Sequence, residues 1–227
     1  MASEGHLIVF EGGEGSGKST QLRLLSDALA RAGVAHHCLR EPGGTALGAE
    51  VRRLVLEREW EVDARAEALL FMASRAQMVS RELRPALASG EHVLLDRFFL
   101  STYAYQIGGR GLPEDEVRAA NGFATGGLVP DLTLLLTFPV AEGLARAAER
   151  SSAHDRMERE GEAFHDRVAG AFEAFARPDW QRAHPECGPI VSIDAGGSEQ
   201  DVASRVQRVL LAQWPGTFPD FTASDHR

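Results

Sequence analysis

Residues 10–20 read FEGGEGSGKST and match G-x-x-x-x-G-K-[ST], the sequence pattern of a phosphate-binding loop. The loop follows an apolar run, Leu7 to Phe10, that predicts a buried strand, and residues 21–32 carry leucines at the spacing of an amphipathic helix. Glycines allow backbone N–H groups to turn toward a phosphate, and a helix that begins there presents its positive dipole end to the same anion. The sequence therefore predicts a nucleoside triphosphate site, with a plain glycine-rich turn as the weaker alternative.

Within this loop, Lys18 and Ser19 carry the side chains that the chemistry needs. The Lys18 ammonium is expected to contact the β- and γ-phosphates of the nucleoside triphosphate, and the Ser19 hydroxyl is expected to ligate Mg²⁺. The residues predicted to bind the nucleoside triphosphate are Gly12, Gly13, Glu14, Gly15, Ser16, Gly17, Lys18, Ser19 and Thr20.

A second pattern lies at residues 92–97, where an apolar strand ends in Asp96 and Arg97. The carboxyl ends of parallel strands are where open α/β folds bind their ligands. Asp96 is expected to hold Mg²⁺ through water, and Arg97 to grip a phosphate with two hydrogen bonds. The alternative is a surface ion pair at a strand end, which is the weaker interpretation in a chain that also has a phosphate-binding loop.

Length and composition restrict the class of protein. The chain has 227 residues and a net charge of −9, which fit one α/β domain and disfavour binding to nucleic acid or to an anionic membrane. Two cysteines without paired spacing suggest neither a disulfide framework nor a zinc site. The sequence shows no secretory signal and no apolar run long enough to span a bilayer, so a cytoplasmic location is expected. We predict a single domain over residues 1–214 and a loose tail over 215–227.

Strand and helix patterns alternate along the chain, with further strands predicted at residues 35–40, 92–97, 132–138 and 190–194. This order is typical of an α/β fold, here with a five-stranded parallel sheet and helices on both faces. Residues 150–161 are dense in charge and have little apolar periodicity. They form either a solvated loop or a mobile lid whose arginines close over a transferred phosphoryl group. No guanine-reading Asn-Lys-x-Asp stretch is present, which disfavours a GTPase.

Three stretches offer side chains for holding a nucleotide. The turn at residues 40–45 contains Pro42 and precedes a helix with Arg52, which is either a phosphate contact or part of a solvated face. Phe71 and Arg75 are four residues apart on one helix face, where they could hold a base, although such a pair more often belongs to core and surface. Residues 101–106 supply hydroxyl groups, aromatic rings and an amide.

Together these motifs resemble the bacterial thymidylate kinase family, over nearly the whole chain from Leu7 to Leu211. The segments that carry the resemblance are 11–20 (EGGEGSGKST), 40–45 (REPGGT), 70–75 (LFMASR), 96–97 (DR), 101–102 (ST), 104–106 (AYQ), 109–111 (GRG), 130–132 (PDL) and 155–158 (DRME). The resemblance implies a P-loop NTPase fold with a lid at about residues 150–161, and a homodimer formed through the long helices. It also implies the reaction of ATP with dTMP to give ADP and dTDP, with Mg²⁺ as cofactor.

The resemblance further implies roles for individual residues. Glu14 would read the 3′-hydroxyl group of the sugar, and Tyr105 would crowd the 2′ position. Phe71 would stack on thymine and Arg75 would hydrogen-bond its carbonyl edge, while Arg97 would clamp the dTMP phosphate. The other residues implied in substrate binding are Pro42, Arg52, Thr102 and Gln106.

The lid is similar to that of the family subgroup that places its catalytic arginine there, and the absence of an arginine from the P-loop of this chain agrees with this resemblance. Arg150 is the first candidate and Arg156 the second, and either would neutralise charge on the transferred phosphoryl group. With Lys18 and Arg97 they form the expected catalytic set. No general base is required, because the phosphate of dTMP is already an anionic nucleophile.

Two other functions fit the same sequence. A kinase for another pyrimidine monophosphate, such as dUMP, is not excluded, because one methyl group in an apolar pocket is worth only ~1–3 kcal/mol. A nucleotide-binding protein without turnover is disfavoured, because Lys18, Arg97 and the lid arginines are all present.

Overall fold

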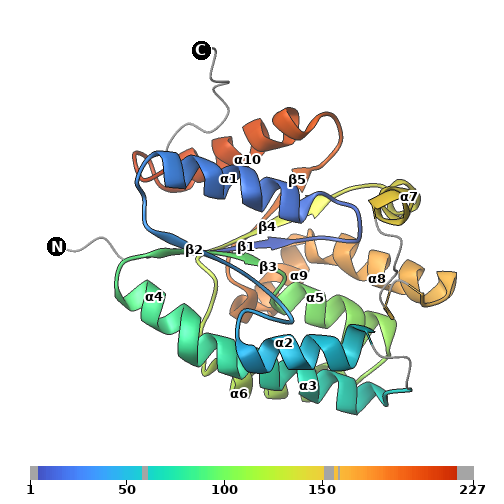
Figure 1. The fold of residues 1–227 in the computed structure, drawn as a ribbon. Helices are drawn as coiled ribbons and strands as arrows, with labels where there is room; N and C mark the ends of the chain where they lie inside the picture. Colours follow the sequence, from blue (N-terminus) through green and yellow to red (C-terminus); the bar gives the residue numbers. More distant parts are fainter. Residues whose placement is uncertain (1–4, 58–60, 151–155, 158, 219–227) are drawn as a thin grey trace.

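The computed structural model describes residues 5–57, 61–150, 156–157 and 159–218, apart from the side chains of 147–150. Its centre is a five-stranded sheet in which all neighbouring strands run parallel, in the order β2-β3-β1-β4-β5 (Figure 1). The strands are β1 (Leu7–Glu11), β2 (His36–Arg40), β3 (His92–Asp96), β4 (Leu132–Thr137) and β5 (Ile190–Asp194). The five-stranded parallel sheet predicted from the sequence is confirmed.

Helices cover both faces of the sheet (Figure 1). Helices α1 (Lys18–Arg31) and α10 (Glu199–Gln213) pack together on one face. The opposite face carries α2 (Ala46–Arg52), α3 (Ala64–Met78), α4 (Arg84–Ala88), α5 (Phe99–Thr102), α6 (Glu114–Thr125), α8 (Glu162–Phe175) and α9 (Pro178–Ala183). Helix α7 (Val140–Arg150) follows β4 at the carboxyl edge of the sheet.

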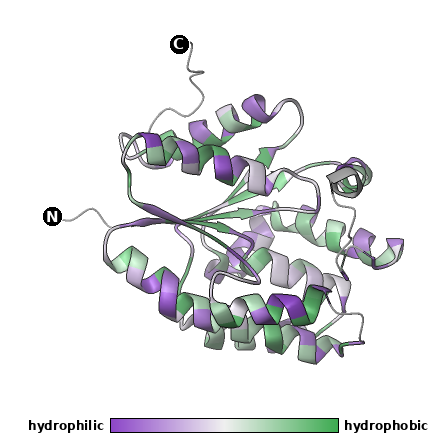
Figure 2. Cartoon of the chain, viewed as in Figure 1, coloured by the Kyte–Doolittle hydropathy of each residue, from purple (hydrophilic) through white to green (hydrophobic). Residues whose placement is uncertain are grey.

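The two apolar cores follow from the alternation of side chains along β1. Leu7 and Val9 pack into the core on the α3 side, whereas Ile8 and Phe10 pack into the core formed with α1 and α10. Both faces are apolar because a parallel sheet between two helical layers is buried on both sides. Figure 2 shows the hydrophobic central strands enclosed by helices that carry most of the hydrophilic residues.

The strand order gathers the predicted motifs at one edge of the sheet. β1 lies between β3 and β4, so ligand-binding loops diverge where these strands end. β1 leads into the glycine loop, β3 ends at Asp96, and β2 leads into the turn at residues 41–45. In the sheet register, Asp96 lies opposite Phe10 of β1 on one side and Arg40 of β2 on the other.

Two helices on the opposite face are continued by π-helical segments. Helix α3 is followed by the π-helical segment Val79–Leu83 and then by α4, which has Pro85 in its first turn. Helix α2 likewise continues into a π-helical segment, Arg53–Glu57. Helix α9 and the short 3₁₀ turn Pro185–Cys187 are not predicted from the sequence, because such short elements contain too few residues to show a period.

The region predicted as a loose tail begins with packed residues. Phe218 is buried, and its ring centroid lies 5.6 Å from that of Trp214 and 5.1 Å from that of His92. The packed part of the chain therefore extends beyond residue 214, because burial of an aromatic ring is favourable. Residues 219–227 lie outside the described part of the chain. Among the helices that are described, none combines the length and apolar character needed to cross a lipid bilayer.

Candidate active site

Two glycines determine the shape of the phosphate-binding loop. Gly12 and Gly15 have φ angles of 142° and 69°, which favour glycine. A Cβ atom on Gly12 would lie 2.4 Å from the backbone oxygen of Leu136, and one on Gly15 would lie 1.9 Å from that of Gly143. The loop can therefore pack against β4 and α7 only with glycine at both positions. This close packing sets the turn that leads into the N-terminus of α1, where backbone N–H groups can meet a phosphate.

Lys18 lies at the start of α1 with its ammonium group over the loop. Its Nζ donates hydrogen bonds to the backbone oxygens of Gly12 and Gly13, at 3.0 and 2.7 Å. Burial, with a further contribution from the charge of Arg97, lowers the pKa of Lys18 to about 8. A phosphate group beside this buried cation would stabilise its charged form.

Ser19 and Asp96 connect the loop to the end of β3. The Ser19 hydroxyl donates a hydrogen bond to Asp96 Oδ2 at 2.7 Å. The other oxygen, Oδ1, is buried and has no hydrogen-bond partner within the described residues. These oxygens suit Mg²⁺, which takes few protein ligands and completes its shell with water and phosphate. No cluster of three or more His, Cys, Asp or Glu suited to a metal ion occurs in the described part of the chain, so a site made entirely of such ligands is not found there.

Arg97 and Glu14 form the centre of the site. Arg97 Nη2 is paired with Glu14 Oε1, which also accepts a hydrogen bond from the Tyr105 hydroxyl at 2.7 Å. Burial raises the pKa of Glu14, but the charges of Arg97 and Lys18 outweigh burial and hold this pKa at about 2. Glu14 is therefore ionised at neutral pH and serves only as a hydrogen-bond acceptor.

Glu11 fixes the backbone that carries Arg97, and it is not among the site residues predicted from the sequence. Its fully buried carboxylate accepts hydrogen bonds from the backbone N–H groups of Phe98, at 2.7 Å, and Ser101, at 3.0 Å. The Ser101 hydroxyl donates a third, at 2.7 Å. Arg97 has a φ of 73°, which is unfavourable for a residue with a side chain. The sequence feature that could have identified Glu11 is its position at the end of an apolar strand. A carboxylate buried there needs hydrogen-bond donors from neighbouring segments.

A pocket of about 210 Å³ opens beside these residues. The predicted residues that line it are Glu14, Gly15, Gly17, Lys18, Ser19, Pro42, Arg52, Phe71, Arg75, Asp96, Arg97, Thr102, Tyr105 and Gln106. Those that do not line it are Gly12, Gly13, Ser16, Thr20 and Arg156. The side chain of Arg150, at the end of α7, lies outside the described part of the structure.

The other residues that line the pocket come from several elements. Thr102 ends α5, and Tyr105 and Gln106 belong to the π-helical segment Tyr103–Gly109 that follows. Arg52, at the end of α2, also lines the pocket and donates a hydrogen bond to the backbone oxygen of Pro42 at 3.3 Å. Phosphate-binding and apolar groups thus share one cavity, as expected for a nucleotide site.

Arg75 borders the pocket, but its guanidinium group is bound within the core. Its side chain is 3% exposed and is paired with Glu41. It also donates hydrogen bonds to Asn121 Oδ1 at 2.5 Å and to the backbone oxygen of Phe98 at 2.8 Å. Phe71, one turn earlier in α3, is half-buried and lines the same pocket. The predicted hydrogen bond from Arg75 to a base stays a prediction, and any such bond would use the donor capacity left by these contacts.

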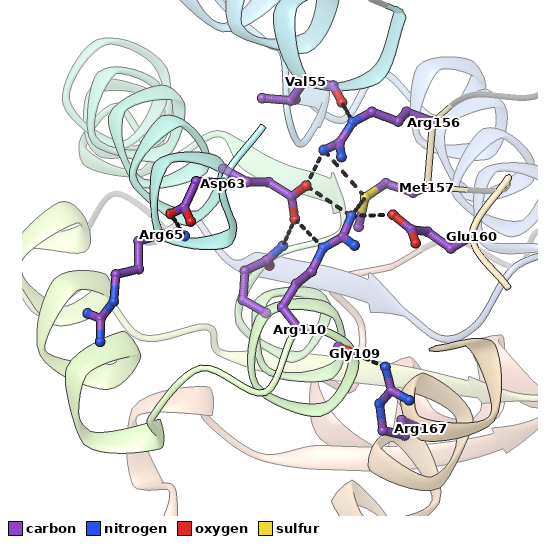
Figure 3. A network of polar contacts seen from close by, with 11 residues as sticks. Val55, Asp63, Arg65, Gly109, Arg110, Arg156, Met157, Glu160 and Arg167 are labelled. Carbon is purple, nitrogen blue, oxygen red and sulfur yellow. Dashed lines mark hydrogen bonds and ion pairs between the residues drawn. The ribbon is translucent and has the colours of Figure 1, made fainter. Parts of the chain in front are cut away.

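Arg156 does not line the pocket, and its side chain is bound by other groups, so the catalytic role expected for it stays a prediction. Its guanidinium group is paired with the buried carboxylate of Glu67 on α3, and its Nε donates a hydrogen bond to the backbone oxygen of Val55 at 2.9 Å (Figure 3). The physical reason is that a buried carboxylate requires a neighbouring positive charge. The sequence contains no local sign of this pairing, because the two residues lie 89 positions apart.

Comparisons with known proteins agree with this geometry. A family model described as thymidylate kinase matches residues 10–186. The chain is 47% identical over 208 residues to a thymidylate kinase of Synechococcus sp. (strain JA-2-3B'a(2-13)), covering 92% of this chain and 95% of the relative. It is 44% identical to a thymidylate kinase of Rhizorhabdus wittichii, covering 93% and 99%. A solved thymidylate kinase structure from Ehrlichia chaffeensis matches with a TM-score of 0.72 and 28% identity, covering 91% and 99%.

Proposed function

The chain belongs to the thymidylate kinase family, and we propose that its 210 Å³ pocket transfers the γ-phosphoryl group of ATP to dTMP, giving ADP and dTDP. It is a nucleoside monophosphate kinase. The observation that carries the assignment of the pocket is that Lys18, the Arg97–Glu14 pair and Phe71 all line it. One cavity thus offers cations for two phosphate groups and an aromatic ring for a base.

The phosphate-binding loop and Lys18 hold the phosphates of ATP in this proposal. The buried ammonium group of Lys18 neutralises the β- and γ-phosphates, whose presence favours its protonated form. Ser19 and Asp96 are the residues that would hold Mg²⁺. The bound ion supplies positive charge that stabilises the transferring phosphoryl group.

Arg97 binds the phosphate of dTMP and aims it at the γ-phosphate, with Arg52 as a helper. This phosphate is anionic at neutral pH and attacks without a general base, so catalysis consists of positioning and charge stabilisation. Glu14 is ionised and already accepts the Tyr105 hydroxyl. It can accept a further hydrogen bond from the 3′-hydroxyl group of the deoxyribose. Tyr105 limits the space at the 2′ position.

The base of dTMP lies against Phe71, between Thr102, Gln106 and the edge of Arg75 that faces the pocket. Stacking on a half-buried ring supplies affinity, and the polar groups supply orientation. Arg150, at the end of α7, is proposed to stabilise charge on the transferred phosphoryl group.

The proposal also includes a homodimer formed by α2, α3 and α6. Three large apolar side chains on these packed helices are exposed: Phe123 at 91%, Leu69 at 63% and Leu47 at 47%. A second copy of the chain would cover them, as large exposed apolar groups favour association. Phe123→Asp is expected to give a monomer in sedimentation velocity, whereas Leu211→Asp, on the outer layer at α10, leaves the dimer intact. A wild-type monomer at micromolar concentration would reject the dimer.

A cytoplasmic location is proposed from the substrates, ATP and dTMP.

The function is tested by coupled ADP release with Mg²⁺-ATP and a panel of dTMP, dUMP, UMP, dCMP, CMP and AMP. We expect a strong preference for dTMP over all other acceptors. Faster turnover with dUMP would retain phosphoryl transfer but overturn the base assignment at Phe71 and Gln106. Absence of turnover with every acceptor would support a nucleotide-binding protein without catalysis.

A further inference from the structure

A carboxylate shielded from solvent lies beside the pocket on α3. Glu67 is 0% exposed, and its Oε1 accepts hydrogen bonds from Gln106 Nε2 and Arg110 Nε, both at 3.2 Å. Its Oε2 accepts a hydrogen bond from Arg110 Nη2 at 3.1 Å and is also paired with Arg156. One carboxylate thus holds three side chains that are distant from it in the sequence.

Arg156 and Glu160 add further contacts to the cluster around Glu67. The backbone N–H and the Nε of Arg156 donate hydrogen bonds to the backbone oxygens of Leu56 and Val55, at 3.0 and 2.9 Å. Glu160 Oε1 lies 2.6 Å from Arg110 Nη2, and Figure 3 shows this pair beside Arg156. Two charges of this segment therefore alternate with two charges from the body of the domain.

The network reaches the wall of the pocket at two positions. Gln106 lines the pocket, and its amide donates to Glu67. Met157, which follows Arg156, is 6% exposed and also lines the pocket. Met157 Sδ lies 3.4 Å from Arg110 Nη2, so the network contacts this side chain directly.

The burial of Glu67 makes the network sensitive to its charge. Removing one member of a buried ion pair leaves the other charge without compensation in a region of low polarity. A glutamine at this position would present an amide N–H₂ group to donors that need an acceptor. Arg110 keeps Glu160 as a partner, so Arg156 and Gln106 are the residues most affected.

We propose that Glu67 is a positioning residue for the part of the pocket that would hold the base of dTMP. It acts through Gln106 and, by way of Arg156, through Met157. This inference rests on the proposed function. It assigns Arg156 to anchoring the segment that carries Met157, and not to the transition state of phosphoryl transfer.

The first test is steady-state kinetics of Glu67→Gln, with Glu91→Gln as the matched control. Glu91 pairs with His37, and its carboxylate is 36% exposed at the far edge of the sheet. For Glu67→Gln we expect the KM for dTMP to rise about ten- to a hundredfold, with the KM for ATP changed less than about twofold. The control should behave like the wild type. An unchanged KM for dTMP in a folded Glu67→Gln protein would overturn the proposal.

The second test compares Arg156→Gln, Arg156→Lys and the double variant Glu67→Gln/Arg156→Gln. If Glu67 acts by way of Arg156, Arg156→Gln raises the KM for dTMP, the double variant is no worse than Glu67→Gln, and Arg156→Lys recovers part of the loss. Arg23→Gln, in an exposed pair with Asp27, is the control for removal of an arginine. A fall in kcat of about 10²-fold or more at constant KM for dTMP would instead identify Arg156 as a transition-state group and overturn the proposal.

Folding is checked by thermal unfolding and by binding of ATP. Arg156 is 18% exposed, so its variants are expected to fold even if Glu67→Gln does not, and the KM–kcat pattern of Arg156→Gln then decides. The two proposals fail separately. Absence of dTMP turnover in the wild type contradicts the function, whereas normal variant kinetics beside an active wild type contradict only the role of Glu67.

Discussion

The phosphate end and the base end proposed for the pocket are built in different ways. At the phosphate end, Lys18 bonds to backbone oxygens five and six residues away, and Asp96 and Arg97 arrive through the pairing of β1 with β3. At the base end, Gln106 and Arg156 are held by one carboxylate that is 39 and 89 residues distant in sequence. The phosphate end therefore depends mainly on backbone geometry, to which the Arg97–Glu14 pair is added, whereas the base end depends on buried side-chain pairs alone.

This difference has consequences for how each end responds to substitution. A site whose shape is set by the backbone keeps that shape when one side chain is changed. The loss in kcat/KM then measures the interaction that the substitution removed. A site built from buried charges can reorganise when one member is lost. We therefore expect losses in kcat/KM with little structural change at the phosphate end, and changes in KM for dTMP at the base end.

The largest effect is expected from Lys18→Met, which removes the buried cation of the loop. Loss of this charge should lower kcat/KM by on the order of 10³-fold or more, because its stabilisation acts on the transferring phosphoryl group. Stability should not fall, since the ammonium group is buried at a cost to its charged form. Kinetics and urea unfolding measure both. A loss below about tenfold would contradict the placement of the γ-phosphate at Lys18.

Arg97→Ala is expected to have the next largest effect. It should lower kcat/KM for dTMP by about 10²- to 10³-fold while ATP binding stays nearly intact, because Arg97 is proposed to hold the acceptor phosphate. The variant also leaves Glu14 without its main positive neighbour, so the pKa of Glu14 should rise from about 2. Calorimetry with ATP and kinetics with dTMP separate the two substrates. Equal losses for both would show that Arg97 serves the whole site.

Glu11→Gln tests whether the backbone of the Arg97 turn matters to catalysis. The three hydrogen bonds to Glu11 hold Phe98 and Ser101, and an amide at this position cannot accept all of them. We expect kcat/KM to fall about tenfold or more and stability to drop by ~1–3 kcal/mol. Unchanged kinetics in a destabilised protein would restrict Glu11 to folding.

The pH dependence of kcat/KM reports on Lys18 in the free enzyme. Because the pKa of Lys18 is lowered to about 8, the ammonium group loses its proton as the pH rises through that value, and kcat/KM should fall about tenfold per pH unit above it. Stability has the opposite sign. The folded pKa lies below the reference value of 10.5, so this group should make the protein more stable as the pH rises from about 8 toward 10.5. A flat profile to pH 10 would contradict the lowered pKa.

The smallest effect is expected from Phe71→Ala at the base end. Loss of the stacking ring should raise the KM for dTMP about tenfold with little change in kcat, because stacking acts on the bound and the reacting nucleotide alike. Leu211→Ala, at a 39% exposed residue of α10 outside the pocket and the proposed dimer interface, is a control for truncation of an apolar side chain. Similar KM values for wild type and Phe71→Ala would move the base away from this ring.

The places of the predicted residues in the fold could be inferred from the sequence more fully at the phosphate end than at the base end, and the roles of these residues stay predictions. The strand, glycine loop and helix around Lys18 are contiguous, and an apolar strand that ends in Asp96 and Arg97 predicts its own place in a parallel sheet. Glu11 was missed although it lies in the motif, because its hydrogen-bond donors come from the segment after the neighbouring strand, β3. Glu67 and the position of Arg156 could not be predicted, because their pairing depends on how α3 and a distant segment pack.

The most direct test is a crystal structure of the chain with ADP, Mg²⁺ and dTMP. We expect the dTMP phosphate within hydrogen-bonding distance of Arg97, the base against Phe71, and the ion beside Ser19 and Asp96, with the Glu67–Arg156 pair intact. A dTMP phosphate that does not touch Arg97, or a base bound away from Phe71, would contradict the assignment of the two ends of the pocket.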